Sequence, residues 1–283
     1  MKLKSLVKLL KRKIIMIDTD LVKAKNDEII KIIQDAGELL LNYFHKINEL
    51  TVERKQGEGL VSEADRETEK FLFEKLTSIV PEAKFIGEES SFDDGQKSIA
   101  KGVQWIIDPL DGTSNFLSGF NYFCVSVALC FDGEPIFGWI YRPSTKETFS
   151  AVKGEGAFLN KKVLTTQERS IKDALLVTGF CVEKGQKFDA EFELFKKVME
   201  HTRGIRRLGS AALDICYCST QLWGGFWERG LSPWDVAAAG LIALESGLKV
   251  TSYQGNEFDP FDSSIIVGNP IAHRELLRVI NNN

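Results

Sequence analysis

The stretch Trp105-Ile-Ile-Asp-Pro-Leu-Asp-Gly-Thr-Ser-Asn115 carries the strongest structural signal in the chain. Its apolar start predicts a buried strand that ends at Asp108, because Pro109 has no N–H to give to a sheet ladder. Asp111 follows three residues later, and Gly112-Thr113 permits a tight backbone at the start of a helix. We therefore expect two carboxylates at one strand end, next to backbone N–H groups that suit a phosphate oxygen.

Carboxylates that a fold holds close together usually share a divalent cation, because each raises the pKa of the other. The alternative for this motif alone is an ordinary turn, in which Asp-Pro and Asp-Gly pairs are common. Two further segments favour the metal site: Gly87-Glu-Glu-Ser90 ends another short apolar run, and Trp234-Asp235 opens an apolar helix. Taken singly, Glu88 is explained by solvation and Asp235 by the helix dipole. Together they indicate one site.

Outward from this segment, the hydrophobic pattern alternates between helical and extended periods. Apolar residues at 29, 32, 33, 36, 40, 43, 44 and 47 follow a helical spacing. We expect helices at 26–47, 62–79, 189–202, 210–221, 232–246 and 270–281. We expect strands at 84–87, 103–107, 122–131, 135–142, 147–152, 174–179, 225–228, 249–252 and 264–267. Three of them, 122–131, 135–142 and 147–152, are expected to form an antiparallel meander. This pattern predicts a layered α/β (α+β) fold.

Composition excludes several classes of protein. The 283 residues are 43% hydrophobic and 27% charged, which is typical of a globular protein, and no segment approaches the roughly 18 to 20 uncharged apolar residues of a membrane span. Residues 1–13 hold six basic and no acidic side chains, so the remainder carries 30 basic and 40 acidic groups, a net charge of −10. A body this acidic argues against broad nucleic-acid binding.

The two ends of the chain are expected to differ. Residues 1–20 are interpreted as a basic N-terminal extension, for which a solvated arm is favoured over a membrane-surface helix or a targeting sequence. Residues 21–283 have no Pro-, Gly- or Ser-rich linker and are expected to form a single unit, with halves at about 21–170 and 171–283.

The five cysteines indicate a reducing, cytoplasmic location. Their number is odd and they lack paired CxxC spacing, so we interpret them as small buried hydrophobic residues rather than disulfides or zinc ligands. They are Cys124, Cys130, Cys181, Cys216 and Cys218.

Three blocks, Gly87-Glu-Glu-Ser90, Asp108-Pro-Leu-Asp-Gly-Thr-Ser-Asn115 and Trp234-Asp-Val-Ala-Ala238, stand in the order and approximate spacing of the inositol monophosphatase family, which this chain resembles over about residues 26–281. Two weaker blocks, Leu60-Val-Ser-Glu-Ala-Asp65 and Gly209-Ser-Ala-Ala-Leu-Asp214, also match. Any single block is unspecific, whereas the combination is highly specific. The resemblance implies the αβαβα sandwich of the inositol monophosphatase and fructose-1,6-bisphosphatase type, usually as a homodimer.

The resemblance also implies roles for individual residues. The first Mg²⁺ would be held by Glu88, Asp108 and the carbonyl of Leu110, and a second by Asp108, Asp111 and Asp235. Asp65 and Thr113 would orient and help to deprotonate the attacking water, and Glu88 would contribute to a third, weaker metal site. Substrate contacts would come from Asp111, Gly112, Thr113, Gly209, Ser210, Ala211, Glu228 and Asp235.

Some of these residues have a second explanation. Ser62 and Asp65 are spaced like a helix-capping pair, and Ser210 is placed as a helix N-cap, which is compatible with a substrate contact. Glu228 precedes Arg229 and could simply pair with an arginine.

We therefore expect a Mg²⁺-dependent, lithium-sensitive phosphatase that hydrolyses a small phosphorylated polyol or nucleotide, with myo-inositol 1-phosphate as the first choice. The alternatives are a 3′(2′),5′-bisphosphate nucleotidase, a histidinol or sugar phosphatase of the same fold, and a regulatory binding protein that does not catalyse. The shared blocks build the metal site, and variable loops choose the leaving group, so these alternatives stay open.

Overall fold

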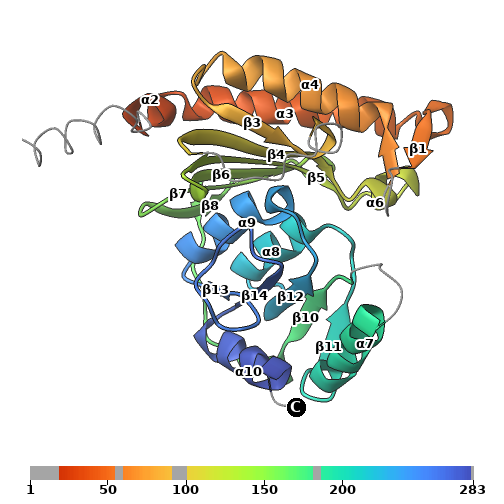
Figure 1. Cartoon of the computed structure of the whole chain (residues 1–283), viewed down its shortest axis with the longest axis vertical. Coiled ribbons are helices and arrows are strands. Elements are labelled where there is room, and N and C mark those ends of the chain that lie inside the picture. Colours follow the sequence, from red (N-terminus) through yellow and green to blue (C-terminus); the bar gives the residue numbers. More distant parts are fainter. Residues whose placement is uncertain (1–18, 55–59, 91–100, 181–185, 282–283) are drawn as a thin grey trace, which may run out of the picture.

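The computed structural model describes residues 19–54, 60–90, 101–180 and 186–281. Within them, five layers of helices and sheets alternate along the long axis of the molecule (Figure 1). This confirms the layered αβαβα sandwich. The expectations for the basic residues 1–13 and for Cys181 lie outside the described residues.

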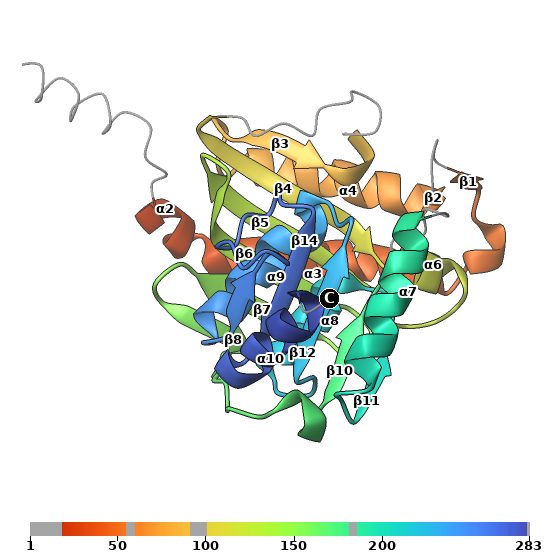
Figure 2. The same ribbon diagram turned by 60° about the horizontal axis from the view of Figure 1, so that its bottom comes forward.

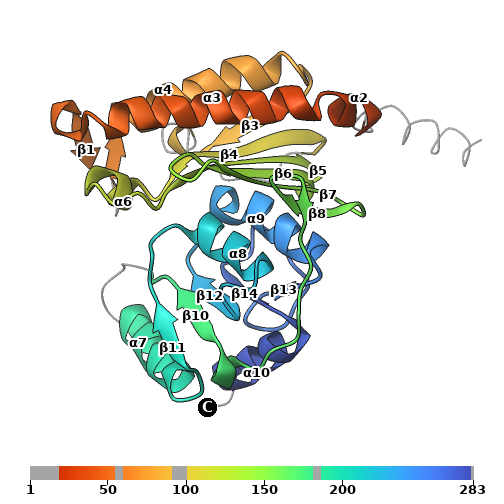
Figure 3. The same cartoon turned by 180° about the vertical axis from the view of Figure 1, so that it is seen from behind.

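The first layer consists of helices α3 (Asn26–Phe44) and α4 (Glu63–Thr77), preceded by the short α2 (Thr19–Ala24). The two long helices lie side by side on the outer face of a sheet (Figures 1 and 3). The buried face of α3 includes Ile29, Ile33 and Leu40, at the spacing of an amphipathic helix. α3 and α4 begin close to the predicted positions, and each ends two or three residues early.

The second layer is a seven-stranded sheet in the order β3-β4-β5-β6-β7-β8-β9. β3 and β4 are parallel, and the other neighbours are antiparallel, which confirms the predicted meander. The strands are β3 (Lys84–Gly87), β4 (Val103–Asp111), β5 (Cys124–Phe131), β6 (Glu134–Arg142), β7 (Glu147–Val152), β8 (Gly156–Leu159) and β9 (Lys162–Val163).

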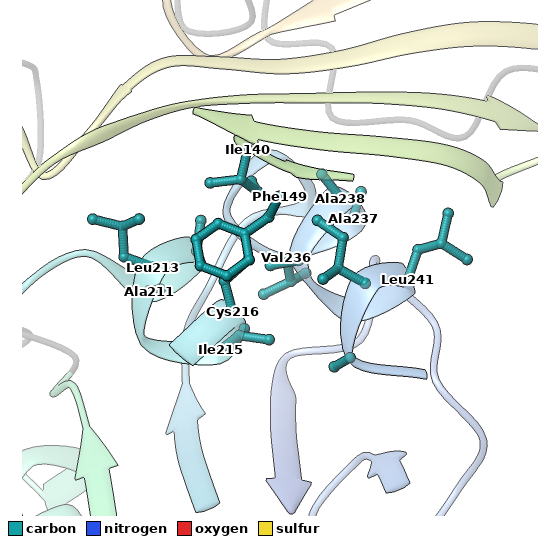
Figure 4. Packing of buried hydrophobic residues seen from close by; sticks show 14 of the residues in the cluster. Ile140, Phe149, Ala211, Leu213, Ile215, Cys216, Val236, Ala237, Ala238 and Leu241 are labelled. Atoms are coloured by element: carbon teal, nitrogen blue, oxygen red, sulfur yellow. The ribbon is translucent and has the colours of Figure 1, made fainter. Parts of the chain in front are cut away.

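The central layer consists of α8 (Ala211–Ser219) and α9 (Pro233–Glu245), which lie between the two sheets. Their small and branched apolar residues pack against Ile140 and Phe149 of the larger sheet (Figure 4). The approach is close at Gly138, where a Cβ atom would lie 2.8 Å from the carbonyl oxygen of Ala238. A larger residue there would push α9 away from the sheet.

The fourth layer is a five-stranded sheet in the order β11-β10-β12-β14-β13, and the fifth consists of α7 (Gln186–Met199) and α10 (Pro270–Asn281) on its outer face (Figure 2). The strands are β10 (Leu175–Thr178), β11 (Gly204–Arg206), β12 (Gly225–Arg229), β13 (Lys249–Thr251) and β14 (Ser264–Gly268). A separate apolar core, which includes Leu176, Trp227 and Leu276, joins these two layers.

Several short elements were not predicted. They are β1 (Val52–Arg54), β2 (Leu60–Ser62), η1 (Ile47–Glu49) and η2 (Ile171–Asp173), together with α2, β8 and β9. The short helix α6 (Thr113–Leu117) begins where Gly112-Thr113 predicts the start of a helix. One prediction was wrong in detail: β4 does not end at Asp108 but continues through Pro109 to Asp111. The strand continues because a bulge lets the ladder resume beyond the proline.

In the part of the chain that the structure describes, no helix is both long and apolar enough to cross a bilayer.

Candidate active site

The bulge in β4 brings two aspartates to the same side of the sheet. Asp108 pairs with Ser126 and Asp111 with Cys124, so three steps along β4 match two along β5. In a regular strand, residues three apart face opposite sides, and one extra residue restores a common face. The two carboxylates therefore converge at one place, as the sequence predicts.

Asp235 joins these two aspartates from the first turn of α9. One carboxylate oxygen from each of Asp108, Asp111 and Asp235 lies within 4.8 Å of the others. These side chains come from the larger sheet and from the central helix layer, so the site forms only when the two layers pack together.

The fold holds one oxygen of each carboxylate by hydrogen bonds. The Leu110 N–H donates to Oδ1 of Asp108 (2.9 Å), and the Ser232 N–H donates to Oδ2 of Asp235 (2.6 Å). Oδ2 of Asp111 accepts from the Ser210 hydroxyl (2.6 Å) and from the Ala212 N–H (2.8 Å). The orientation of all three carboxyl groups is thereby set by backbone and helix termini.

Burial and mutual repulsion disfavour the charged forms of these groups. Desolvation, followed by the charge of Glu88, raises the pKa of Asp108 well above its usual range. Desolvation also raises the pKa of Asp111 to about 6, and it raises the pKa of Asp235, with Asp111 as the next cause. A divalent cation relieves this repulsion, and its preferred ligands are carboxylate and carbonyl oxygens. The donor set therefore fits a hard divalent metal ion.

Glu88 follows directly after β3, the strand parallel to β4. It is half-buried, and its negative charge contributes to the raised pKa values of Asp108, Asp111 and Asp235. Glu88 thus lies within electrostatic reach of the three aspartates, although it is not among the residues whose oxygens fall within 4.8 Å of one another.

Asp65 is both a helix cap and a partner of Thr113. Its Oδ2 accepts from the N–H of Ser62 (2.8 Å), which completes a capping box at the start of α4. Its Oδ1 accepts from the Thr113 hydroxyl at 3.0 Å. The two explanations open at the sequence level are therefore compatible, because each uses a different carboxylate oxygen.

Thr113 begins the short helix α6, and Gly112 precedes it with a φ of +100°. This left-handed conformation suits glycine, and a Cβ atom at position 112 would lie 2.9 Å from the carbonyl oxygen of Tyr122. The Thr113 hydroxyl also lies 3.1 Å from the carbonyl oxygen of Leu110. The glycine turn thus sets this hydroxyl between Asp65 and the end of β4.

The loop before α8 is bonded to the aspartate cluster. Ser210 occupies the N-cap position but makes no capping hydrogen bond with its side chain, and its hydroxyl instead donates to Asp111. Gly209 adopts a φ of +84° beside the side chain of Asn115, and Ala211 begins the helix. Ser210 is therefore the N-cap residue of α8, as predicted, but its side chain orients Asp111 and does not cap the helix.

Glu228 lies on β12, packed against Gly179. Desolvation and the charges of Asp214 and Asp111 raise its pKa to about 8. The neighbouring Arg229 pairs instead with Glu191 of α7, at 2.9 Å. The proposed pairing of Glu228 with the adjacent arginine is thus not what the structure shows.

Two features of the site were missed at the sequence level. The Tyr122 hydroxyl donates to Asp214 at 2.7 Å, and this buried carboxyl group contributes to the raised pKa of Glu228. The Asn115 amide donates to the carbonyl oxygens of Tyr122 (2.7 Å) and Leu208 (2.8 Å) and so joins the two loops that flank Asp111. Asn115 and Asp214 stood inside the matched blocks, and Tyr122 did not, but spacing alone does not reveal partners about 90 residues away.

Comparison with known proteins agrees with this geometry. The model of the inositol monophosphatase family matches residues 25–283. An inositol-1-monophosphatase of Mesorhizobium japonicum is 37% identical over 247 residues, which cover 87% of this chain and 91% of the relative. A protein named Nus factor SuhB, of Vibrio cholerae, is 34% identical over 255 residues, which cover 90% and 94%.

Solved structures show the same fold. The extragenic suppressor protein suhB of Bartonella henselae has a TM-score of 0.83 at 34% identity and covers 92% of this chain and 99% of its own. Inositol monophosphatase II of Staphylococcus aureus has been solved with inositol monophosphate (TM-score 0.72) and with 2′-AMP (TM-score 0.74), both at 26% identity. The match to the inositol monophosphate complex covers 88% of this chain and 90% of the relative, and the match to the 2′-AMP complex covers 90% and 93%. The chain described here therefore belongs to the inositol monophosphatase family.

Proposed function

We propose that this protein hydrolyses small phosphomonoesters with Mg²⁺ and that myo-inositol 1-phosphate is its preferred substrate. The observation that carries the proposal is the convergence of Asp108, Asp111 and Asp235, the first two buried and the third partly buried, beside the Asp65–Thr113 hydrogen bond. The uncatalysed barrier to phosphate-ester hydrolysis is very high, and positioning and charge neutralisation are the main means of lowering it. A cluster of oxygen ligands next to a hydroxyl–carboxylate pair supplies both.

We assign one Mg²⁺ to Glu88, Asp108 and the Leu110 carbonyl, and a second to Asp108, Asp111 and Asp235, with Glu88 contributing to a third, weaker site. When bound, these ions would lower the pKa of a coordinated water and neutralise charge on the leaving oxygen. Mg²⁺ is preferred to zinc because every assigned ligand is an oxygen.

Thr113 and Asp65 are proposed to handle the proton of the attacking water. The Thr113 hydroxyl, which donates to Oδ1 of Asp65, can accept a hydrogen bond from a water on its other side. As the water loses its proton, Asp65 can take up the hydroxyl's proton, because burial already raises the pKa of Asp65. The N–H groups of Gly112 and Thr113 are proposed to bind a phosphate oxygen.

Substrate hydroxyl groups are assigned to Glu228, to Asp235 and to the loop before α8. We propose that Glu228, Asp235 and the backbone of Gly209 to Ala211 contact them, and that Ser210 acts mainly by orienting Asp111. The high pKa of Glu228, about 8, makes this group a hydrogen-bond donor or acceptor near neutral pH.

The test is phosphate release from a substrate panel at fixed Mg²⁺ and in EDTA. The panel compares inositol 1-phosphate with 3′-phosphoadenosine 5′-phosphate, 2′-AMP, histidinol phosphate and a sugar phosphate. Metal-dependent turnover, highest kcat/KM for inositol 1-phosphate and inhibition by lithium are expected. An Asp108→Asn preparation purified in the same way controls for a contaminating phosphatase.

Other outcomes of the panel favour the alternatives. The 2′-AMP bound to the Staphylococcus aureus relative favours a nucleotide as the second candidate, and a higher kcat/KM for nucleotides would replace inositol 1-phosphate. The Vibrio cholerae relative is named a Nus factor, which makes a regulatory role the third candidate. We would assign that role if the present protein bound Mg²⁺ but hydrolysed no member of the panel.

We also propose, on the family likeness alone, that the protein acts as a homodimer. A cytoplasmic location is proposed because Cys124, Cys130, Cys216 and Cys218 are buried free thiols. Sedimentation of the purified chain tests the first point, and cell fractionation tests the second.

A further inference from the structure

Glu69 is a buried carboxylate that the proposed reaction does not use. It lies on α4, and only 7% of the residue is exposed. Its Oε2 accepts from the N–H of Glu89 (2.8 Å) and its Oε1 from the N–H of Ser90 (2.9 Å). One side chain of the outer helix layer thus holds the segment 88–90 that follows β3.

The same carboxylate packs against Gly87, the residue before Glu88. A Cβ atom at position 87 would overlap the carboxyl group of Glu69. The backbone on both sides of Glu88 is therefore fixed by Glu69, through contact at Gly87 and through hydrogen bonds at Glu89 and Ser90.

Asp65 and Glu69 are four residues apart and so lie on one face of α4. Asp65 contacts Thr113 at the start of α6, and Glu69 contacts the segment 88–90 after β3. One helix face therefore connects the hydroxyl beside the aspartate cluster with the segment that carries Glu88.

We propose that Glu69 is a positioning residue that holds Glu88 at the divalent-metal site. The inference rests on the proposed function, since it takes Glu88 as a metal ligand. Mg²⁺ demands a near-ideal arrangement of its ligands, so a ligand that follows directly after a short strand needs support from the groups around it. Loss of such supporting hydrogen bonds typically weakens metal binding by about 10- to 100-fold.

A carboxylate suits this task better than an amide. It offers two acceptor oxygens to two N–H groups, whereas glutamine offers one acceptor and sets an NH₂ group against the second donor. Glu69→Gln keeps the size of the side chain and removes half of the support, which makes it the sharpest single change.

The experiment is isothermal titration of the metal-free, full-length protein with Mg²⁺ alone. Glu69→Gln is expected to raise the Kd for Mg²⁺ by about 10-fold or more. Glu74→Gln, the same change at an exposed position of the same helix, is expected to leave the Kd within about two-fold of the parent. In assays, Glu69→Gln should need more Mg²⁺ for half-maximal rate, with kcat largely restored at saturating Mg²⁺.

A second variant approaches the same contact from the other side. Gly87→Ala places a methyl group against the Glu69 carboxyl group without removing any ligand. It should raise the Kd in the same direction, and the double variant should be less than additive, because both changes act on one contact. If Glu69→Gln does not fold, Gly87→Ala decides the question.

A folded Glu69→Gln or Gly87→Ala protein whose Kd for Mg²⁺ matches the parent would overturn the inference, because a purely structural tether changes stability without changing metal affinity. Failure of the proposed function looks different: a parent that binds Mg²⁺ but hydrolyses no phosphomonoester removes the function, whereas the shift in Kd still supports the positioning role. A parent that binds no Mg²⁺ at millimolar concentration overturns both.

Discussion

Single carboxylates in this site serve the fold and the chemistry together. Asp65 and Asp235 each occupy the third position of a helix and complete a capping box, one with Ser62 and the other with Ser232. Capping fixes one oxygen and aims the other, which is the preorganisation that a catalytic or metal-binding group requires. Stability and site geometry therefore depend on the same hydrogen bonds.

Asp108 is the residue whose loss should be most severe, since it is assigned to both metal ions. Asp108→Asn should lower kcat/KM by at least about 10³-fold, roughly 4 kcal/mol of transition-state stabilisation. Asparagine keeps an acceptor for the Leu110 N–H and removes a buried like charge, so the metal-free variant should unfold no more easily than the parent.

Kinetics and urea unfolding of the same Asp108→Asn preparation check both points. Asp173→Asn, at an exposed position, serves as the control and should leave both quantities unchanged. Turnover within a few-fold of the parent would remove Asp108 from the metal assignment.

Thr113 tests the proton path separately from metal binding. Thr113→Val removes the hydroxyl that donates to Asp65 while it keeps the shape of the side chain. A loss of kcat of about 10²- to 10⁴-fold is expected, the usual range for general acid–base groups, with an unchanged Kd for Mg²⁺. Thr113→Ser, which keeps the hydroxyl, should retain most of the activity, and equal losses in both variants would argue for a packing role instead.

At the scale of elements, the long helices and the central strands were predictable because their apolar periods are long and regular. β4 was predicted too short, because a proline in a strand usually ends the ladder and a bulge cannot be foreseen from residue types. The hairpin β1–β2 and the short strands β8, β9 and β11 carry too few residues for a period to be measured. The acidic residues of the site were predictable as a set, whereas Glu69, Asn115 and Tyr122 act through contacts that only the packed layers create.

The turn between β4 and α6 should be sensitive to its glycine. Gly112→Ala meets both a positive φ and the Tyr122 carbonyl oxygen, whereas Gly119→Ala meets a positive φ of +75° with nothing within 4 Å. The left-handed conformation alone costs a non-glycine residue about 1–2 kcal/mol, and the close contact adds to it. Urea unfolding should therefore show a larger loss for Gly112→Ala than for Gly119→Ala, and equal losses would show that the loop relaxes around the methyl group.

The central helix layer, α8 and α9, joins the two sheets of the molecule. Residues of α8 and α9 belong to one apolar core with both sheets, so neither proposed half, about 21–170 or 171–283, buries its inner face alone. We therefore propose that residues 21–283 unfold as a single cooperative unit. The site lies where this layer meets the larger sheet, which couples metal binding to the packing of the whole sandwich.

Residues 14–283 carry a net charge of −10, and several of their acidic side chains are buried together at the site. Burial raises the pKa of Asp108, Asp111, Asp235 and Glu228 above their usual values. A raised pKa in the folded protein means that the folded state binds protons more tightly than the unfolded state. The stability that this provides is complete below about pH 4 and is lost as the pH rises through the folded pKa values, which reach about 6 for Asp111 and about 8 for Glu228.

The metal-free protein should therefore lose stability between about pH 5 and pH 8, and Mg²⁺ should restore it. Metal binding needs deprotonated carboxylates, so the gain in Tm on adding saturating Mg²⁺ should increase with pH over the same range. Burial lowers the pKa of His273, so this residue makes stability fall as the pH is lowered, the opposite of the effect of the carboxyl groups. It acts equally in EDTA and in Mg²⁺ and therefore cancels in the gain in Tm. Thermal unfolding in EDTA and in Mg²⁺ at several pH values measures this difference, and in Asp108→Asn it should be smaller at every pH. A gain in Tm that is constant with pH would mean that the aspartates are already ionised in the metal-free protein.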